Sequence, residues 1–168
     1  MEILAQLALM VLGALVSAGV SILLEKRSIR SSPIQLLGKW FTRWKPVLSD
    51  SQNWVEGSVE IVERLGKLEL KSEENSGGYR WQGTARLVQD GFLVGEWRSC
   101  KPAAHARGVF TLAVEVEGGF LCGFFMGPET PGARLASPLV LGRTSLEVDR
   151  GVTRLGQSGL DSISLNPA

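Results

Sequence analysis

The stretch that most restricts the fold of this chain is residues 3–24, ILAQLALMVLGALVSAGVSILL, an apolar run without a charged side chain. Gln6 is its one strongly polar residue. A helix rises about 1.5 Å per residue, so the run would reach roughly 33 Å, which matches a hydrocarbon core of about 30 Å. The run predicts a membrane-spanning helix, and the rest of the chain is expected to work beside a bilayer.

Two other interpretations of this run remain open. Val16, Ser17 and Ala18 resemble the cleavage site of a signal peptide. However, the chain begins Met1-Glu2 without the usual basic segment, and the run exceeds the usual ~7 to 15 apolar residues. A buried core helix would be shorter or would carry a polar stripe, and this run has none.

The residues that flank the run predict its orientation. Basic side chains are concentrated after it, whereas the preceding flank has only Glu2 and the amino group. The basic residues are Lys26, Arg27, Arg30, Lys39, Arg43 and Lys45. Because cytoplasmic flanks of membrane helices are enriched in Lys and Arg, we expect a single-pass protein with its N-terminus outside and the remainder in the cytoplasm.

Small side chains recur on one face of the predicted span, at Gly13, Ser17 and Ser21. Such a face lets helix backbones approach one another in lipid, so these residues are candidates for assembly of the spans into a homo-oligomer. The alternative is that Gly, Ala and Ser are simply common in membrane helices.

After a short polar linker, the apolar pattern changes to a period of two. Val59, Ile61, Leu68 and Leu70, for example, alternate with polar or charged side chains, which is typical of half-buried antiparallel strands. Residues 34–45 fit either a short interfacial helix or, as we prefer, a first strand that ends before Pro46. The segments amount to about eight strands with turn signals every ten residues or so, and no convincing helix.

Eight short antiparallel strands predict an all-β fold, either a meander closed into a calycin-like barrel or a sandwich. We favour the barrel, because closure removes edge strands and allows one small ligand to be held. The predicted organisation is a membrane helix with its basic flank at 1–27, a linker at 28–35, a barrel domain at 36–143 and a poorly ordered tail at 144–168.

Composition excludes several classes of function. The net charge is +1 and the basic excess lies beside the predicted span, so binding to a nucleic acid polymer is not expected. Cys100 and Cys122 form no CxxC pair and His105 is the single histidine, which argues against a metal site. The sequence contains no GxSxG, HExxH or Gly-rich phosphate loop, so we expect neither an enzyme nor a bound cofactor.

One face of the strands between residues 79 and 127 combines aromatic side chains with glycines. This inward set comprises Tyr79, Trp81, Gly83, Ala85, Leu87, Leu93, Gly95, Trp97, Ser99, Phe110, Leu112, Val114, Leu121, Gly123 and Phe125. Glycines beside large rings either leave a ligand cavity or merely let a small barrel pack its taper. The sequence does not decide between these two interpretations.

A cavity with flat aromatic walls would favour a planar ring such as a nucleobase. The candidate ligand-binding walls are Tyr79, Trp81, Trp97, Phe110 and Phe125. Phosphates on the same ligand would need guanidinium groups at the rim, for which Arg98, Arg107 and Arg134 are candidates because they lie at strand ends or in loops.

The segment YRWQGTARLVQDGFLVGEWRSCKPAAHARGVFTL, with GGFLCGFFMGP and PLVLGR after it, resembles the small β-barrel of membrane-anchored effectors in bacterial cyclic-oligonucleotide anti-phage signalling (CBASS). The shared spacings are GxLxGxWxS, GxFxL and GFxxG. The resemblance implies an inner-membrane protein whose cytoplasmic barrel senses a cyclic di- or trinucleotide made by a partner nucleotidyltransferase. Binding would then drive oligomerisation and membrane disruption, leading to abortive infection. These effectors typically carry two spans, whereas this chain has one predicted span.

Two alternative functions also assume a barrel tethered to the membrane, but they involve no membrane disruption. Calycin-like barrels such as lipocalins and avidins also have Gly and Trp at similar spacings, so a membrane-tethered module that binds an apolar small molecule or lipid is the runner-up. A solid barrel that binds only its neighbours is the third.

Overall fold

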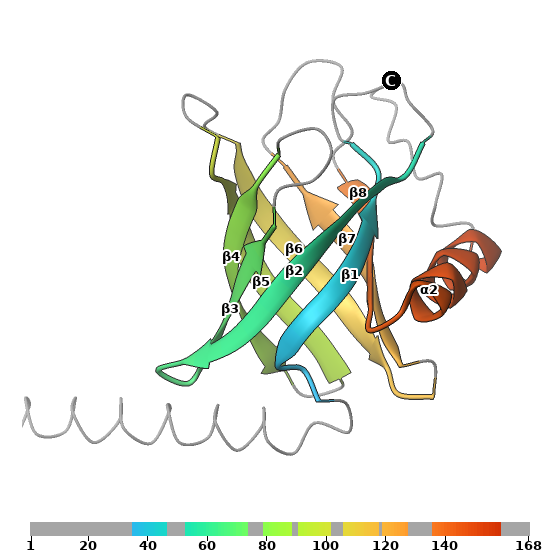
Figure 1. Cartoon of the computed structure of the whole chain (residues 1–168), viewed down its shortest axis with the longest axis horizontal. Coiled ribbons are helices and arrows are strands. Elements are labelled where there is room, and N and C mark those ends of the chain that lie inside the picture. The colour runs from blue at the N-terminus through green and yellow to red at the C-terminus, as the bar shows by residue number, and fades with distance from the viewer. Residues whose placement is uncertain are drawn as a thin grey trace, which may run out of the picture.

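The computed structural model describes residues 35–46, 53–73, 79–88, 91–101, 106–117, 119–127 and 136–158. Eight antiparallel strands form a closed barrel in which each strand pairs with its neighbours in sequence and β8 closes on β1 (Figure 1). The predicted meander barrel is therefore confirmed, and the sandwich alternative is wrong. The predicted membrane helix at 3–24 lies outside the described residues, and in the part of the chain that is described no helix combines the length and hydropathy needed to cross a bilayer.

The elements follow the chain in order. The strands are β1 (Gly38–Trp44), β2 (Val55–Arg64), β3 (Lys67–Ser72), β4 (Trp81–Val88), β5 (Phe92–Ser99), β6 (Arg107–Glu115), β7 (Phe120–Met126) and β8 (Ala136–Gly142), and a helix, α2 (Ser145–Gln157), follows them. Trp40 and Thr42 are both buried on the inner face of β1, so this segment is a strand and not an interfacial helix.

The barrel interior is built from the face that the period of two predicts. Each strand contributes apolar side chains to one buried cluster, because successive residues of a strand point to opposite faces. Members of this cluster are Trp40, Val59, Ile61, Leu68, Leu70, Ala85, Leu93, Trp97, Phe110, Leu112, Leu121, Phe125, Leu139 and Leu141. Seven of them belong to the predicted inward set, whose orientation is thus confirmed at those positions.

The two ends of the barrel are built from different connections, because consecutive strands run in opposite directions. The end that we call the turn end contains the start of β1, the β2–β3, β4–β5 and β6–β7 connections and the end of β8 (bottom of Figure 1). The opposite end, which we call the mouth end, contains the end of β1 together with residues 79–81, 97–101, 106–108 and 125–127. The described chain reaches β1 from Gln35 at the turn end.

Arg143 holds the turn end closed. Its guanidinium lies over the ring of Trp40, 4.1 Å from the ring centroid. Its Nη atoms donate hydrogen bonds to three backbone carbonyl oxygens, those of Lys39 (2.7 Å), Leu37 (2.6 Å) and Gln35 (2.5 Å). The buried Trp40 indole donates to the carbonyl oxygen of Leu36 (2.8 Å), so the segment that leads into β1 is fixed across this end.

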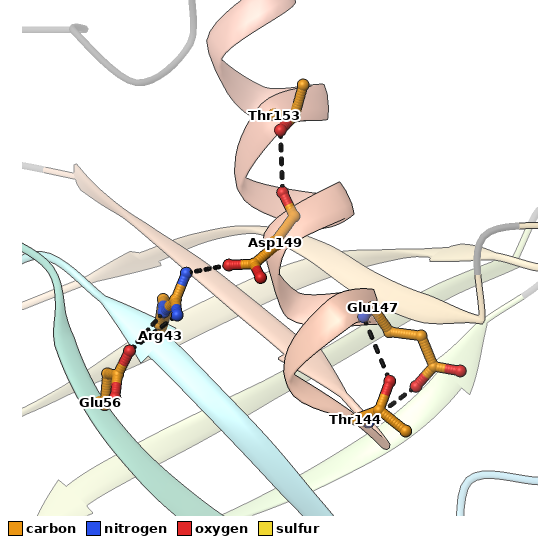
Figure 2. Close-up of polar contacts among 6 residues, drawn as sticks. All are labelled: Arg43, Glu56, Thr144, Glu147, Asp149 and Thr153. Carbon is orange, nitrogen blue, oxygen red and sulfur yellow. Dashed lines mark hydrogen bonds and ion pairs between the residues drawn. The ribbon is translucent and has the colours of Figure 1, made fainter.

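The segment after the barrel was expected to be a poorly ordered tail, and this prediction is wrong for residues 145–157, which form α2. A capping box begins the helix (Figure 2): Thr144 Oγ1 accepts from the Glu147 backbone N (3.3 Å), and the Glu147 carboxylate accepts from the Thr144 N (2.9 Å). Val148, Gly151 and Leu155 share one face of the helix and are buried. That face packs in a second apolar cluster with residues of β7 and β8.

Close approach and polar contacts both fix α2 to the barrel wall. A Cβ at Gly151 would lie 2.4 Å from Val140 Cγ1, so the helix can pack this closely only with glycine at that position. On the other side, Arg43 of β1 contacts Asp149 and pairs with Glu56 of β2, with an N–O distance of 2.7 Å (Figure 2). Thr153 Oγ1 donates to the Asp149 carbonyl oxygen (2.9 Å) within the helix. The barrel and α2 therefore form one packed unit.

Candidate functional site: an aromatic pocket at the mouth end

The mouth end contains a small pocket with aromatic walls. Its volume is about 40 Å³, and it is lined by Trp44, Tyr79, Trp81, Trp97, Phe110, Phe125 and Leu139. All five aromatic residues that the sequence predicts as ligand-binding walls are therefore brought together by β4, β5, β6 and β7 and the segment that precedes β4.

Two lining residues were not among the predicted set. Trp44 shares a strand face with Trp40, so the period of two could have placed it inside the barrel. Leu139 gives no such signal, because α2 covers the outside of β8 and every residue from Ser137 to Gly142 is buried.

The rings in the pocket meet at their edges. Phe125 lies at the centre, with its centroid 5.9 Å from that of Trp44 and 5.8 Å from that of Trp97, each at an interplanar angle of 81°. Tyr79 lies 5.6 Å from Trp44 at 46°. Edge-to-face pairs of this kind are favourable because the positive edge of one ring faces the negative face of the next. The walls are thus ordered by their own contacts before any ligand binds.

Glycines on neighbouring strands make room for these rings. Trp97 pairs across the sheet with Gly83 on one side and Gly108 on the other, and a Cβ at Gly108 would lie 2.8 Å from Trp97 Nε1. Phe110 pairs with Gly95, where a Cβ would lie 2.6 Å from Phe110 Cζ. The space beside Gly95 and Gly108 is occupied by these rings and, at shorter distance, by backbone oxygens of neighbouring strands, as the packing interpretation expects. The pocket is the space that remains at the mouth end.

A few polar contacts set the positions of the walls. The Trp97 indole N–H donates to the Met126 carbonyl oxygen (3.0 Å), which fixes the orientation of that ring. The Trp81 backbone N–H donates to Ser72 Oγ (2.7 Å) and ties the start of β4 to β3. Burial raises the pKa of Tyr79, and its hydrogen bond with Ser99 acts in the opposite direction. The phenol therefore stays neutral at physiological pH.

Arg98 and Arg107 lie away from this pocket. They are cross-strand neighbours on the outer face of β5 and β6, and both line a groove of about 980 Å³ over β3 to β6. With the Gln82 amide oxygen turned toward Arg98, that oxygen accepts from Nη2 (2.5 Å) and Nε (2.6 Å). Lys71 continues the same row of outward side chains. The outer row is basic, and the barrel wall separates it from the aromatic pocket.

Several predicted residues lie outside the described part of the chain. They are Arg134 and the three small residues of the predicted span, Gly13, Ser17 and Ser21.

The cysteines are not joined. Cys100 is exposed and Cys122 is buried between β7 and α2. Burial, together with the charge of Glu115, raises the pKa of the Cys122 thiol to about 11, so this thiol is protonated and unreactive at neutral pH. Within the described ranges no group of three or more His, Cys, Asp or Glu side chains is arranged to hold a metal ion.

Closed eight-stranded barrels with a pocket at one mouth form a class of architecture that can hold one small ligand. Comparison with protein-family models, with curated proteins and with solved structures finds no match to this chain. Its function is therefore inferred from the aromatic pocket, the basic outer row and the sequence that precedes the barrel.

Proposed function

We propose that this chain is a membrane-anchored anti-phage effector whose barrel senses a cyclic oligonucleotide. In this proposal a base of the ligand stacks on the aromatic rings at the mouth end, residues 3–24 hold the protein in the bacterial inner membrane, and ligand binding drives assembly of the spans. The observation that carries the proposal is the convergence of Trp44, Tyr79, Trp81, Trp97 and Phe125 on one opening.

The size of the pocket defines how a base would bind. A cavity of about 150 Å³ can enclose benzene, and a nucleobase is larger than benzene. The pocket measures about 40 Å³, so a base cannot be enclosed without movement of the walls. The half-buried rings of Trp44, Tyr79 and Trp81 form its outer part, and a base that displaces or stacks on them would gain about 1–3 kcal/mol from stacking.

This movement supplies a route from binding to assembly. A ligand shifts a conformational equilibrium only by the difference between its affinities for the two states. If the base binds best to a barrel in which the rings of Trp44, Tyr79 and Trp81 are displaced, binding stabilises that conformation. It then also stabilises any barrel–barrel contact that forms in that conformation. The small-residue face at Gly13, Ser17 and Ser21 would then let the spans pack in the membrane.

Two of the three arginines predicted to bind the phosphates of this ligand do not line the pocket. Arg98 and Arg107 face the outer groove and are separated from the pocket by the barrel wall. Arg134, the third candidate, lies outside the described residues.

A second function is favoured by one specific observation, the apolar character of the pocket. In the described part of the chain no charged side chain lines it. A membrane-tethered module that holds an apolar molecule, such as the end of an acyl chain, fits this lining without phosphate contacts. The two proposals differ in the ligand and in whether binding leads to membrane damage.

Thermal unfolding of the full chain in detergent separates them. A panel of cyclic di- and trinucleotides and of fatty acids is added, and a ligand at a hundredfold excess over Kd should stabilise the fold by ~2.7 kcal/mol. The shift should be lost in Trp81→Ala and retained in the control Trp54→Ala, since Trp54 packs in the α2 cluster away from the pocket.

A shift with fatty acids alone would favour the apolar-ligand function. A nucleotide-dependent shift that survives in Trp81→Ala would place the nucleotide elsewhere. Absence of any shift across the panel would contradict both functions.

A further inference from the structure

We propose that the turn end of the barrel docks onto the surface of the bilayer, so that the aromatic pocket faces away from the membrane. The inference rests on the membrane anchor in the proposed function and adds an interaction surface to it. The occupant of this surface is the lipid headgroup region.

Exposed apolar side chains gather at the turn end. Of the seven large hydrophobic residues exposed in the described part of the chain, four lie at this end: Leu65 (81% exposed), Leu146 (59%), Val116 (51%) and Phe92 (40%). Leu65 and Val116 lie in the β2–β3 and β6–β7 turns, whereas Phe92 is the first residue of β5 and Leu146 lies in the first turn of α2. Turns normally carry Gly, Asn, Asp, Ser or Pro, so the exposed Leu65 and Val116 need a reason.

The β2–β3 turn shows most clearly that folding alone does not explain these residues. Leu65 has φ 51° and Gly66 has φ 81°, the arrangement of a hairpin turn in which both central residues are left-handed. Asn, Asp or Gly is preferred at the first of these positions, and a leucine is strained there. The chain nevertheless has a leucine with most of its surface in water. Contact with an apolar phase would compensate for that strain.

The charges beside Leu65 suit an anionic surface. Arg64 and Lys67 flank the turn and are both exposed. An apolar tip between two basic side chains can insert between headgroups while the cations stay at the phosphate level. Glu117 follows Val116 in the β6–β7 turn, so this turn carries a negative charge next to its apolar residue. Docking of this turn therefore depends on contact between Val116 and the bilayer.

The path of the chain places this end next to the membrane. Gln35, the first described residue, lies at the turn end and is held there by Arg143. Residues 25–34 separate it from the predicted span, and even fully extended they reach only about 35 Å. These residues include Lys26, Arg27 and Arg30, which also favour an anionic headgroup layer. The turn end is thus the end that the anchor brings to the bilayer.

Docking in this orientation has a consequence for the ligand. The pocket opens at the opposite end, so its ligand would arrive from the aqueous phase and not from the membrane. This favours a soluble ligand over a lipid drawn from the bilayer.

The test uses the full chain in liposomes of phosphatidylethanolamine and phosphatidylglycerol that contain nitroxide-labelled lipid. In a Cys100→Ser background, an environment-sensitive fluorophore is attached at Leu65→Cys or, as the control at the mouth end, at Lys101→Cys. The buried Cys122 is not modified under native conditions because its thiol is buried and protonated. Docking predicts that lipid quenches the label at position 65 and leaves the label at position 101 bright.

Quenching that is equal at the two positions, or absent from both, would overturn the docking. Extraction of the unlabelled protein at alkaline pH tests the anchor separately. A protein that resists extraction but shows no quenching at position 65 retains the anchor and refutes the docking, whereas release from the liposomes refutes the anchor and the docking together.

Leu65→Asn provides a second measurement. Asparagine tolerates the left-handed backbone, so this variant should raise the melting temperature in detergent. In liposomes it should reduce the lipid quenching of a label at Leu146→Cys, because one apolar contact is lost. A variant that leaves this quenching unchanged would show that Leu65 does not contact lipid.

Discussion

Replacement of Arg143 by methionine tests whether this side chain closes the turn end. The guanidinium donates to the carbonyl oxygens of Gln35, Leu37 and Lys39 and covers the ring of Trp40. Methionine retains apolar contact with the ring but removes all three donors and the charge. The segment that connects the barrel to the predicted span would then be held mainly by Leu36 and its bond with Trp40.

The expected loss follows from these contacts. A hydrogen bond from a charged donor contributes ~1.5–3 kcal/mol when buried. Gln35 and Lys39 are exposed, so water would replace part of each lost bond, and we take about 1 kcal/mol for each of the three. The contact with the Trp40 ring adds roughly 0.5–1 kcal/mol. The variant should therefore lose about 3.5–4 kcal/mol of unfolding free energy, which corresponds to roughly 10 °C in melting temperature.

Urea and thermal unfolding of the full chain in detergent measure this loss. Arg150→Met is the matched control, since Arg150 is exposed on α2 and its side chain makes no hydrogen bond or ion pair with another described residue. Arg143→Lys keeps the charge but cannot reach three carbonyl groups in one plane, so it should fall between the wild type and Arg143→Met. If Arg143→Met unfolds at the same midpoint as Arg150→Met, the clamp contributes nothing and the reasoning is refuted.

Three further outcomes follow from other contacts. Gly95→Ala should destabilise the barrel by roughly 1–3 kcal/mol, because a Cβ there would lie 2.3 Å from the Thr84 backbone oxygen and 2.6 Å from Phe110 Cζ, and an unchanged urea midpoint would contradict this packing. Thr144→Ala should cost about 1 kcal/mol by removing the cap of α2, whereas Ser145→Ala in the next position should cost much less. The pKa of the buried Cys122 thiol is raised to about 11 from an ordinary value near 9, so stability should be full below pH 9 and fall between pH 9 and 11. Cys122→Ala should lack this part of the alkaline loss, and an identical pH profile in the variant would contradict the assignment.

The barrel itself could be predicted because most of its strands have a polar outer face. Alternation of the kind seen at Trp97 and Arg98 identifies the inner face, and the glycines between strands locate the turns. The same alternation puts Arg98 on the outer wall, so the period of two already separated it from the inward rings. The prediction that Arg98 lies at the pocket relied on its position near the end of a strand rather than on this alternation.

Helix α2 was missed for a physical reason. Its buried face consists of Val148, Gly151 and Leu155 only, and a glycine in the middle of this face reduces the apolar signal. The capping box of Thr144 and Glu147 was a readable start signal that the scattered small residues of the segment obscured. Packing of this helix against β8 also removes the polar face that would have allowed Leu139 to be predicted.

The measurement that most directly tests the central claim is release of a dye from liposomes that contain the full chain. A panel of cyclic di- and trinucleotides is added to the wild type, to Trp81→Ala and to Gly13→Leu/Ser17→Leu. The account predicts that one nucleotide causes release from liposomes with the wild type and from neither variant, while the Gly13→Leu/Ser17→Leu protein still shows the thermal shift. Release that occurs without any nucleotide, or that is unchanged in both variants, would contradict the claim that the aromatic pocket controls assembly of the span.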